Sequence, residues 1–417
     1  MNHLPDFPVQ APTGAAIQTA IDEAAKAGGG RVVVPATTIP CGSLRLRSHV
    51  ELHFEKGAVL LGGTKPEDYA SFPKDVCAIA PEGSYKVFLY AYDEEDIAIT
   101  GEGTIDGQGP SFFDKPYDPP FGQFWPKPPI ERPRMVQFIR CKGVRLEGAT
   151  FKDSPCWTML IRQCENVFVD GITVTADQRM INNDGIDFDG CRHVRVTRSH
   201  FHTGDDCIIL RAMREADNDE KILSEDFEAT DCVLESACQT IRIGCPSDDE
   251  IRDARFRNIR AKGRNGIFFD YPVRYLRPSD EGFVDVHGLT FEHYDCEATE
   301  SALQIVVEPG VKVRSIRDIV FRDFRVRSAR SLRFVGNAFS PIHNVLLENV
   351  QAHVDAEPWL LGAETDGLRC RNVEWTTPTD HGTIADEVLA TPPGSSAPLV
   401  RSNTQSWETK KQTKKND

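Results

Sequence analysis

Apolar residues recur along most of the chain at positions 0, +2, +5 and +7 of a repeat. Steps of two are the period of a β-strand, and the change from +2 to +5 marks a bend between two short strands. A weaker copy begins at Ile97. The clear copies then begin at Val144, Val167, Val194, Phe227, Ala254, Leu289, Ile319, Val345 and Leu368. The repeat therefore predicts short strands and no helix over most of the chain.

Most copies carry a third apolar strand after the bend, such as the segment containing Ile186 and Phe188 or the one containing Ile208 and Leu210. Three short strands cannot bury a core alone, but stacked copies share a continuous apolar interior. We therefore expect an all-β fold, a right-handed, single-stranded parallel β-helix of about ten coils. The alternative is a β-sandwich, in which successive copies are not expected to keep one phase.

The N-terminal end of the solenoid has a helical pattern. Ile17, Ile21 and Ala25 have helical spacing, and three glycines at 28–30 follow, which end a helix well. We expect a capping helix within about residues 13–35.

The repeat stops after Trp375, and the segment that follows Pro392 is rich in Pro, Ser, Thr and Lys. We expect one catalytic domain over residues 1–391 and a disordered polar tail over residues 392–417.

Two acidic motifs occupy the same phase of consecutive copies, Asn182-Asn183-Asp184-Gly185 and Gly204-Asp205-Asp206-Cys207. Because stacked strands lie about 4.8 Å apart, their three aspartates should converge on one patch. Two carboxylates that flank a glycosidic bond can hydrolyse it, one donating a proton to the leaving oxygen and the other activating water. An Asp beside a Gly also caps turns, but three aspartates in one phase favour catalysis.

These motifs resemble the polygalacturonase family, glycoside hydrolase family 28, and the resemblance extends over about residues 13–375. It implies a parallel β-helix that hydrolyses pectin-like poly- or oligosaccharides, of galacturonate, rhamnogalacturonan or mixed sugars, by single displacement with inversion. By this resemblance Asp205 is the general acid, and Asp184 and Asp206 hold and deprotonate the water. The resemblance implies no metal and no cofactor.

The chain departs from the family at two motifs. Cys238-Gln239-Thr240 replaces the family's Gly-His-Gly, so Gln239 stands in place of a helper histidine. Phe268-Phe269-Asp270 replaces an Arg-Ile-Lys that binds the galacturonate carboxylate.

Two interpretations of specificity follow from these departures. In one, Arg211 or Arg242 holds a uronate carboxylate through its planar guanidinium. In the other the sugar is neutral, Phe268 stacks on it and Asp270 accepts its hydroxyl groups. In either case, Arg242 could also pair with Asp187, which lies in its own column of outward positions.

Long connections are expected to wall the cleft. The gap between Ile97 and Val144 is too long for one coil and contains a Pro-rich aromatic loop, in which Trp125 is a candidate sugar platform. The alternative is that this loop packs on its own aromatic residues. Residues 211–224 and 271–275 are further wall segments. Deep walls would favour exo action on short chains, and Asn182, Asp187 and Tyr271 complete the candidate substrate-binding residues.

Composition excludes several classes of partner. The net charge of −15 argues against a nucleic acid, whose phosphates need clustered Lys and Arg. No run of 18 apolar residues suggests a membrane span. The first six residues do not read as a signal peptide, so we expect a cytoplasmic enzyme, or a secreted one whose leader was removed. The oligomeric state is not defined by the sequence.

Cysteine spacing favours buried thiols. Cys141, Cys164 and Cys191 each stand three residues before a copy, which predicts a ladder at one corner of the coils. No C-x-x-C pair supports zinc, and a disulfide among the other nine cysteines is the alternative.

Two other functions fit the same fold. A polysaccharide lyase would need calcium and an Arg or Lys base, and would release a product that absorbs ultraviolet light. A non-catalytic carbohydrate-binding solenoid would bind without turnover. The aspartate trio favours the hydrolase.

Overall fold

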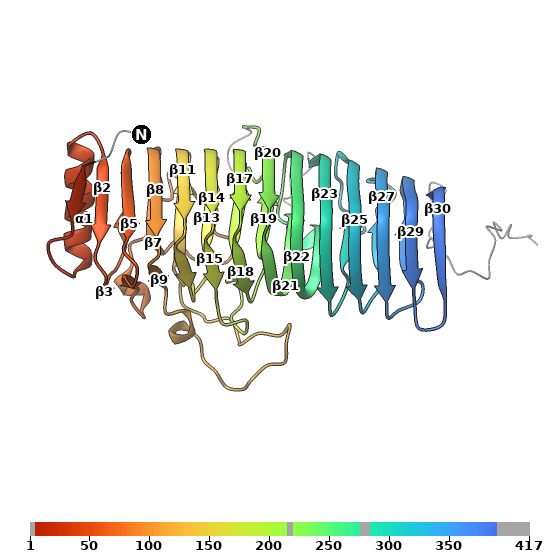
Figure 1. Cartoon of the computed structure of the whole chain (residues 1–417), viewed down its shortest axis with the longest axis horizontal. Coiled ribbons are helices and arrows are strands. Elements are labelled where there is room, and N and C mark those ends of the chain that lie inside the picture. The colour runs from red at the N-terminus through yellow and green to blue at the C-terminus, as the bar shows by residue number, and fades with distance from the viewer. Residues whose placement is uncertain (1–4, 215–219, 276–283, 390–417) are drawn as a thin grey trace, which may run out of the picture.

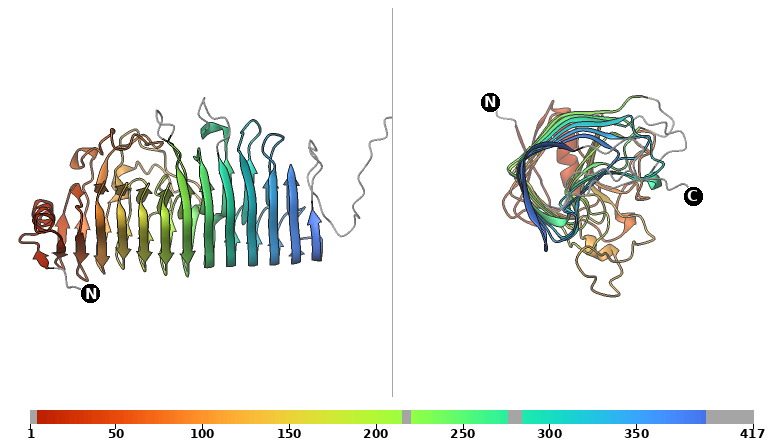
Figure 2. Two further views of the ribbon diagram at one scale, coloured as in Figure 1. Left: turned by 90° about the horizontal axis from the view of Figure 1, so that it is seen from above. Right: turned by 90° about the vertical axis from the view of Figure 1, so that its right-hand side faces the viewer.

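The computed structural model describes residues 5–214, 220–275 and 284–389, and within them nearly every strand pairs in parallel with the equivalent strand of the next coil (Figure 1). The strands lie across a long axis, with α1 (Gly14–Lys26) at one end and β30 (His381–Leu389) at the other (Figure 2). The expected all-β parallel β-helix is therefore confirmed. The expected tail at 392–417 lies outside the described residues.

Three parallel ladders form the walls of the solenoid. The first contains β2 (Gly30–Val34), β5 (Val50–Phe54), β8 (Glu95–Gly101), β11 (Lys142–Glu147), β14 (Glu165–Asp170), β17 (Arg192–Thr197), β20 (Leu223–Thr230), β22 (Glu250–Tyr271), β23 (Asp285–Ala298), β25 (Ser315–Ser328), β27 (Ile342–Val354) and β29 (Thr365–Thr376). The second contains β3 (Thr38–Pro40), β6 (Val59–Leu61), β9 (Thr104–Asp106), β12 (Thr150–Lys152), β15 (Thr173–Thr175), β18 (His200–Thr203) and the start of β21 (Val233–Gly244).

The third ladder carries the acidic motifs. It contains β4 (Leu44–Arg45), β7 (Val87–Tyr92), β10 (Arg134–Ile139), β13 (Met159–Arg162), β16 (Ile186–Asp189), β19 (Ile208–Arg211), the ends of β21 and β22, β24 (Leu303–Val307), β26 (Leu332–Val335) and β28 (Leu360–Ala363). The ladders begin before Ile97, the first copy recognised from the sequence, because β2 and β5 already pair in the same phase.

A left-handed residue makes each bend between the first two strands of a copy. The position at +4 has a positive φ in every copy, and the position just before the copy does as well. Glycine, Asn and Asp adopt this conformation at least cost, and they fill most of these places. Asn258 and Asn349 are examples at +4, with φ of 54° in each. The bend that the apolar spacing implied is therefore a single left-handed residue.

The core is a column of inward side chains that repeat from coil to coil. Phe256 stacks on Phe291 with ring centroids 4.9 Å apart, and Phe291 stacks on Phe321 at 5.2 Å. All three rings are fully buried. Each ring therefore buries its neighbours, and the stability of one coil depends on the next.

Both ends of the solenoid are covered. Ile17 and Ile21 of α1 are buried, and the side chain of Thr13 caps the helix by accepting the N–H of Ala16. Ala24 rather than Ala25 completes the fully buried face. At the other end β30 pairs antiparallel with β29, a strand that the sequence pattern did not predict. Among the described residues, no helix is both long and apolar enough to cross a membrane.

The remaining short elements are β1 (Asp6–Pro8), which pairs with β2, and three 3₁₀ turns at Pro66–Asp68, Gly109–Phe112 and Val273–Tyr275. All twelve cysteines are free thiols, and the N–H of Cys141 donates to Sγ of Cys164 over 3.3 Å. Cys191 adjoins Cys164 in turn. The predicted thiol ladder is therefore confirmed.

We expect Phe291→Ala to lower the free energy of unfolding by about 3–5 kcal/mol, because it leaves a cavity between two stacked rings. Denaturant unfolding followed by circular dichroism measures this loss. Phe339→Ala is the control, since that ring is 67% exposed, and its effect should stay within about 0.5 kcal/mol. Equal effects of the two variants would contradict the dependence on stacking.

Candidate active site

Strand register brings the two acidic motifs together. Ile186 pairs with Ile208 across β16 and β19, so Asp184 and Asp206, each two residues earlier, lie at neighbouring positions of adjacent coils. The predicted column Asp187, Ile209, Arg242 and Phe268 is also present in the pairing of β16, β19, β21 and β22. The alternation read from the sequence therefore placed these residues correctly.

Asn183 joins the two motifs. Its Oδ1 accepts the backbone N–H groups of Gly204 at 2.8 Å and Asp205 at 2.9 Å, and its Nδ2 donates to the carbonyl of Asp177. The side chain is fully buried. Asn183 thus sets the turn that presents Asp205. The sequence shows Asn183 within its motif but does not indicate this role.

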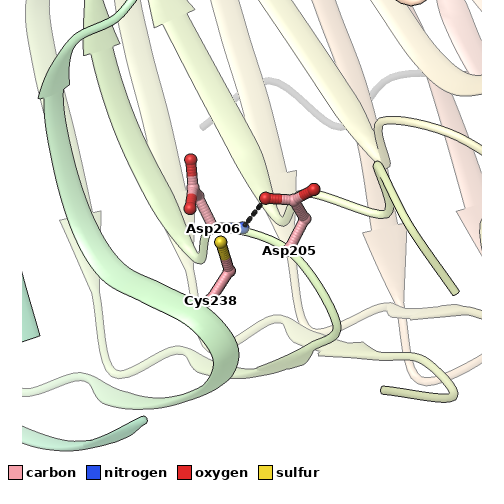
Figure 3. A group of neighbouring side chains, drawn as sticks. All are labelled: Asp205, Asp206 and Cys238. Carbon is pink, nitrogen blue, oxygen red and sulfur yellow. Dashed lines mark hydrogen bonds between the residues drawn. The ribbon is translucent and has the colours of Figure 1, made fainter. Parts of the chain in front are cut away.

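Backbone donors orient the Asp205 carboxylate. Its Oδ2 accepts the N–H of Asn182 at 3.1 Å, and its Oδ1 accepts the N–H of Asp206 at 3.1 Å (Figure 3). Asn182 has a positive φ of 62°, and Arg132 holds its side chain through a 2.9 Å hydrogen bond to Oδ1. Asp205 is therefore fixed in one orientation by neighbouring turns.

The site keeps protons on its carboxyl groups at mildly acidic pH. Burial, and then the charge of Asp206, raise the pKa of Asp205 to about 6. Burial, followed by the charges of Asp205 and other carboxylates, also raises the pKa of Asp184 well above its usual range. Among the described residues, Oδ1 of Asp184 has no hydrogen-bond partner. Asp184 and Asp205 are therefore a coupled pair suited to proton transfer.

Two arginines neutralise the deeper aspartates. Nη2 of Arg211 lies 2.7 Å from Oδ1 of Asp187 and 3.7 Å from Oδ2 of Asp184. Burial nevertheless raises the pKa of Asp187 to about 7. Arg211 is thus held in an ion pair at the wall of the cleft, which it also lines.

Arg242 also has acidic partners, but not the one considered from the sequence. Its Nη1 lies 2.9 Å from Oδ2 of Asp206, and its Nη2 bonds to Asp270. The considered pair with Asp187 is not formed, because Arg211 occupies that carboxylate. Arg211 and Arg242 are therefore both paired with carboxylates in this structure, and the interpretation in which one of them binds a uronate stays a prediction. One carboxylate oxygen of Asp270, Oδ2, accepts a hydrogen bond from Arg242.

A cleft with a volume of 530 Å³ opens above these ion pairs. Eight of the predicted site residues line it: Asn182, Asp184, Asp205, Arg211, Gln239, Arg242, Phe268 and Asp270. Asp187 and Asp206 have no exposed surface and lie beneath the cleft. Gln239 lines the cleft, but its Oε1 is buried and has no hydrogen-bond partner among the described residues.

Besides Asp187 and Asp206, two predicted residues do not line the cleft. Trp125 is 3% exposed, with its ring between Phe113 and the guanidinium of Arg179, and its Nε1 donates to the carbonyl of Tyr117. The loop therefore packs on its own aromatic residues, which was the alternative. Tyr271 also points away, because the side chain after Asp270 alternates into the core.

Four more residues line the cleft, and of these Lys127 and Arg264 were not singled out from the sequence. Lys127 of the long loop and Arg264 of β22 line the cleft, as does Arg274 of the expected wall at 271–275. Trp157 also lines it, with its ring between the guanidinium groups of Arg134 at 4.8 Å and Arg211 at 4.5 Å. Of the wall expected at residues 211–224, positions 215–219 lie outside the described residues.

Asp205, Asp206 and Cys238 bring ligand atoms within 4.8 Å of one another (Figure 3). These residues do not suit a metal ion. Burial raises the pKa of the Cys238 thiol well above its usual range, whereas a metal binds the thiolate. Asp206 is already paired with Arg242.

Comparison with known proteins agrees with this site. A model of glycosyl hydrolases family 28 matches residues 82–225, the range that contains both acidic motifs. A probable polygalacturonase from Vitis vinifera is 25% identical over 89% of this chain and 77% of its own length.

Solved structures share the fold. A hyperthermoactive exopolygalacturonase from Thermotoga maritima superposes with a TM-score of 0.75 at 21% identity, over 93% of this chain and 98% of its own. An endo-xylogalacturonan hydrolase from Aspergillus tubingensis superposes with a TM-score of 0.60 at 15% identity, over 91% and 98% of the two chains. The family-model match, the polygalacturonase relatives at low identity and the two acidic motifs are together consistent with a divergent member of glycosyl hydrolases family 28.

Proposed function

We propose that the protein hydrolyses glycosidic bonds in pectin-like poly- or oligosaccharides, with inversion at the anomeric carbon. The observation that carries this proposal is the coupled pair Asp184 and Asp205, both lining the cleft and both with raised pKa values. One carboxyl group of such a pair keeps a proton while the other is ionised. That division is what acid-assisted attack by water requires.

In this mechanism Asp205 donates its proton to the leaving oxygen as the bond to the anomeric carbon breaks. A water molecule attacks that carbon from the opposite face and gives up a proton to an ionised carboxylate. The product is a reducing sugar of inverted configuration, and solvent restores the two protonation states. Because the carboxylates are buried, their electrostatic interactions with the reacting groups are stronger than they would be in bulk solvent.

The charges of the cleft support an acidic sugar. Five of the twenty lining residues are Lys or Arg and five are Asp or Glu, so the lining is balanced in formal charge, whereas the whole chain carries a net charge of −15. Lys127 and Arg264 form no ion pair with any described residue, whereas Arg211 and Arg242 do. The names of the relatives, polygalacturonase and endo-xylogalacturonan hydrolase, point to the same chemistry. We therefore assign Lys127 and Arg264 to a sugar carboxylate, and Phe268 to the face of a ring.

The long loop between β9 and β10 supports exo action. In Figure 1 it projects from the lower side of the stack and extends toward β21 and β22. A side-chain carbon at Gly122 would lie 3.2 Å from Cδ of Arg264, so the tip of the loop packs on that arginine. A loop that spans several coils narrows the cleft on one side.

We expect Asp205→Asn to lower kcat by about 10²–10⁴-fold, because the amide cannot donate the proton to the leaving oxygen. Release of reducing ends from oligogalacturonates and rhamnogalacturonan fragments measures the effect, and absorbance tests for a lyase product. Asp366→Asn is the control, since that side chain is 76% exposed and lies far along the solenoid. Cleavage that is indifferent to Asp205 would refute the assignment.

The pKa of Asp205 predicts the pH dependence. Burial raises the pKa of Asp205 to about 6, so the carboxyl group is protonated below that pH and loses its proton above it. We expect kcat/KM to fall as pH rises through about 6, by roughly tenfold per unit. A profile from pH 4 to 9 checks this, and a rate that is flat from pH 5 to 8 would be inconsistent with Asp205 as the acid.

Arg264→Gln should raise KM for an acidic oligosaccharide by about tenfold with kcat unchanged, since a charge-assisted hydrogen bond in the ground state is lost. The control substrate is the methyl ester of the same oligosaccharide. It carries no carboxylate, so wild type and variant should have the same KM for it. An equal change in KM on both substrates would show that Arg264 does not bind the carboxylate.

A further inference from the structure

A second hollow lies beside the catalytic cleft, at the corner where each coil turns toward the third ladder. Its volume is 690 Å³, against 530 Å³ for the cleft. The lining extends from Glu235 of β21 to Asp355, just after β27. These strands are four pairings apart in the stack, so the hollow is about 19 Å long. We call it the outer groove, and its length suits a chain rather than a single small molecule.

The tip of the long loop separates the outer groove from the cleft. Phe121 lines the groove, and a side-chain carbon at the next residue, Gly122, would lie 3.2 Å from Cδ of Arg264, which lines the cleft. Gly263 of the groove directly precedes that arginine in β22. The two hollows therefore share one edge, so a chain that extends beyond the cleft at Arg264 reaches the groove.

Phe121 is displayed by the loop rather than packed within it. Its side chain is 51% exposed, whereas Phe113 and Trp125 of the same loop are buried. Small residues such as Gly263 and Ala298 also line the groove, which leaves room in front of the ring. The apolar face of a sugar ring can stack on an exposed aromatic ring of this kind. Phe121 is therefore placed to hold a sugar outside the cleft.

A row of alternating charges also lines the outer groove. Lys262, Glu297 and Arg327 follow one another in the pairing of β22, β23 and β25, and we call them the rim row. Within the described part of the chain, none of their side chains forms a hydrogen bond or an ion pair. By contrast, Arg322 of β25 bonds to carboxylates on both neighbouring rungs. The polar groups of the rim row are therefore open to a ligand.

The outer groove offers stacking and hydroxyl hydrogen bonds rather than attraction for an anion. Its lining contains two cations, Lys262 and Arg327, and three carboxylates, so an acidic group gains little from its overall charge. Cations donate hydrogen bonds and carboxylates accept them, and a hydroxyl group can do both. The ligand that fits this surface is therefore a sugar chain recognised through its ring faces and hydroxyl groups.

We propose that the outer groove binds the part of the substrate chain that extends beyond the cleft. This inference rests on the proposed function. The end that reacts occupies the cleft, and the rest of the chain passes the tip of the long loop. Phe121 stacks on one sugar ring, and the rim row bonds to hydroxyl groups. The groove adds affinity for long chains without touching the bond that is broken, so it determines the preferred length of the substrate.

The length dependence of KM tests the outer groove. Phe121→Ala should raise KM for the polymer about tenfold with kcat unchanged, because a stacking contact is lost. KM for a disaccharide, which is too short to leave the cleft, should stay at the wild-type value. Phe121→Trp keeps an aromatic ring and should keep the wild-type KM for the polymer. Phe339→Ala removes a ring that is 67% exposed and does not line the groove, so it should change neither KM.

The rim row has a matched control on the same strand. Arg327→Gln should raise KM for the polymer about threefold, because a hydrogen bond to a hydroxyl group is weakened. Arg325→Gln changes a side chain that lies two residues earlier on β25, is 73% exposed and does not line the groove. It should leave KM unchanged. Equal effects of the two variants would count against recognition by the rim row.

Affinity electrophoresis measures binding without turnover, in gels that contain polygalacturonate or its methyl ester. The Asp205→Asn variant, which leaves the polymer intact, is compared with the same variant carrying Phe121→Ala. The second change should weaken retardation by both polymers to the same extent, since ring faces and hydroxyl groups are common to them. A loss confined to the acidic polymer would overturn recognition through stacking and hydroxyl groups.

The outcomes separate the outer groove from the proposed function. A wild-type enzyme that hydrolyses none of the substrates overturns the proposed function, whereas retardation that depends on Phe121 supports the groove as a carbohydrate site even then. Hydrolysis by the wild type, with KM for Phe121→Ala unchanged on the polymer or raised equally on the disaccharide, overturns the groove alone. A KM that rises only for long chains, with Phe121→Trp like the wild type, supports it.

Discussion

Lateral stacking in a single register is the constraint on which this structure depends. Residues of equal phase lie about 4.8 Å from their counterparts in the next coil, so every position of the repeat becomes a column. Inside the solenoid a column must be apolar, as in the stacked rings Phe256 and Phe291. Outside, buried carboxylates need cations from the same column or from the one beside it. Arg162, Arg211 and Arg242 do so for Asp189, Asp187 and Asp206, and each pair joins neighbouring coils.

The catalytic geometry follows from the same constraint. Asp184 and Asp206 are neighbours because their strands pair in register, and Asn183 ties the turn of one coil to that of the next. The cleft floor is therefore a set of alternating charges rather than an acidic patch. This arrangement lets several ionisable groups stay buried together, with pKa values that burial raises most and that neighbouring charges then adjust.

The columns could be predicted from the sequence because a strand has a period of two and the copies keep one phase. The ion-pair partner of each charged side chain could not be predicted in this way. An arginine side chain reaches across more than one rung, so Arg242 could meet Asp187 or Asp206, and the outcome depends on Arg211 having taken Asp187. Loop residues do not follow the period of the repeat. The burial of Trp125 and the position of Lys127 in the cleft lining therefore became visible only in the structure. Tyr271 was misplaced although strand alternation already directed it inward.

In the long loop, the residue that fixes the loop to the protein is different from the residue that faces the cleft. Trp125 is fixed between Phe113 and Arg179, whereas Lys127, two residues further on, faces the cleft. A substitution at position 127 therefore leaves the attachment of the loop intact. The charge at the rim of the cleft can therefore change without disturbing either the packing of the loop or the turns that carry the three aspartates.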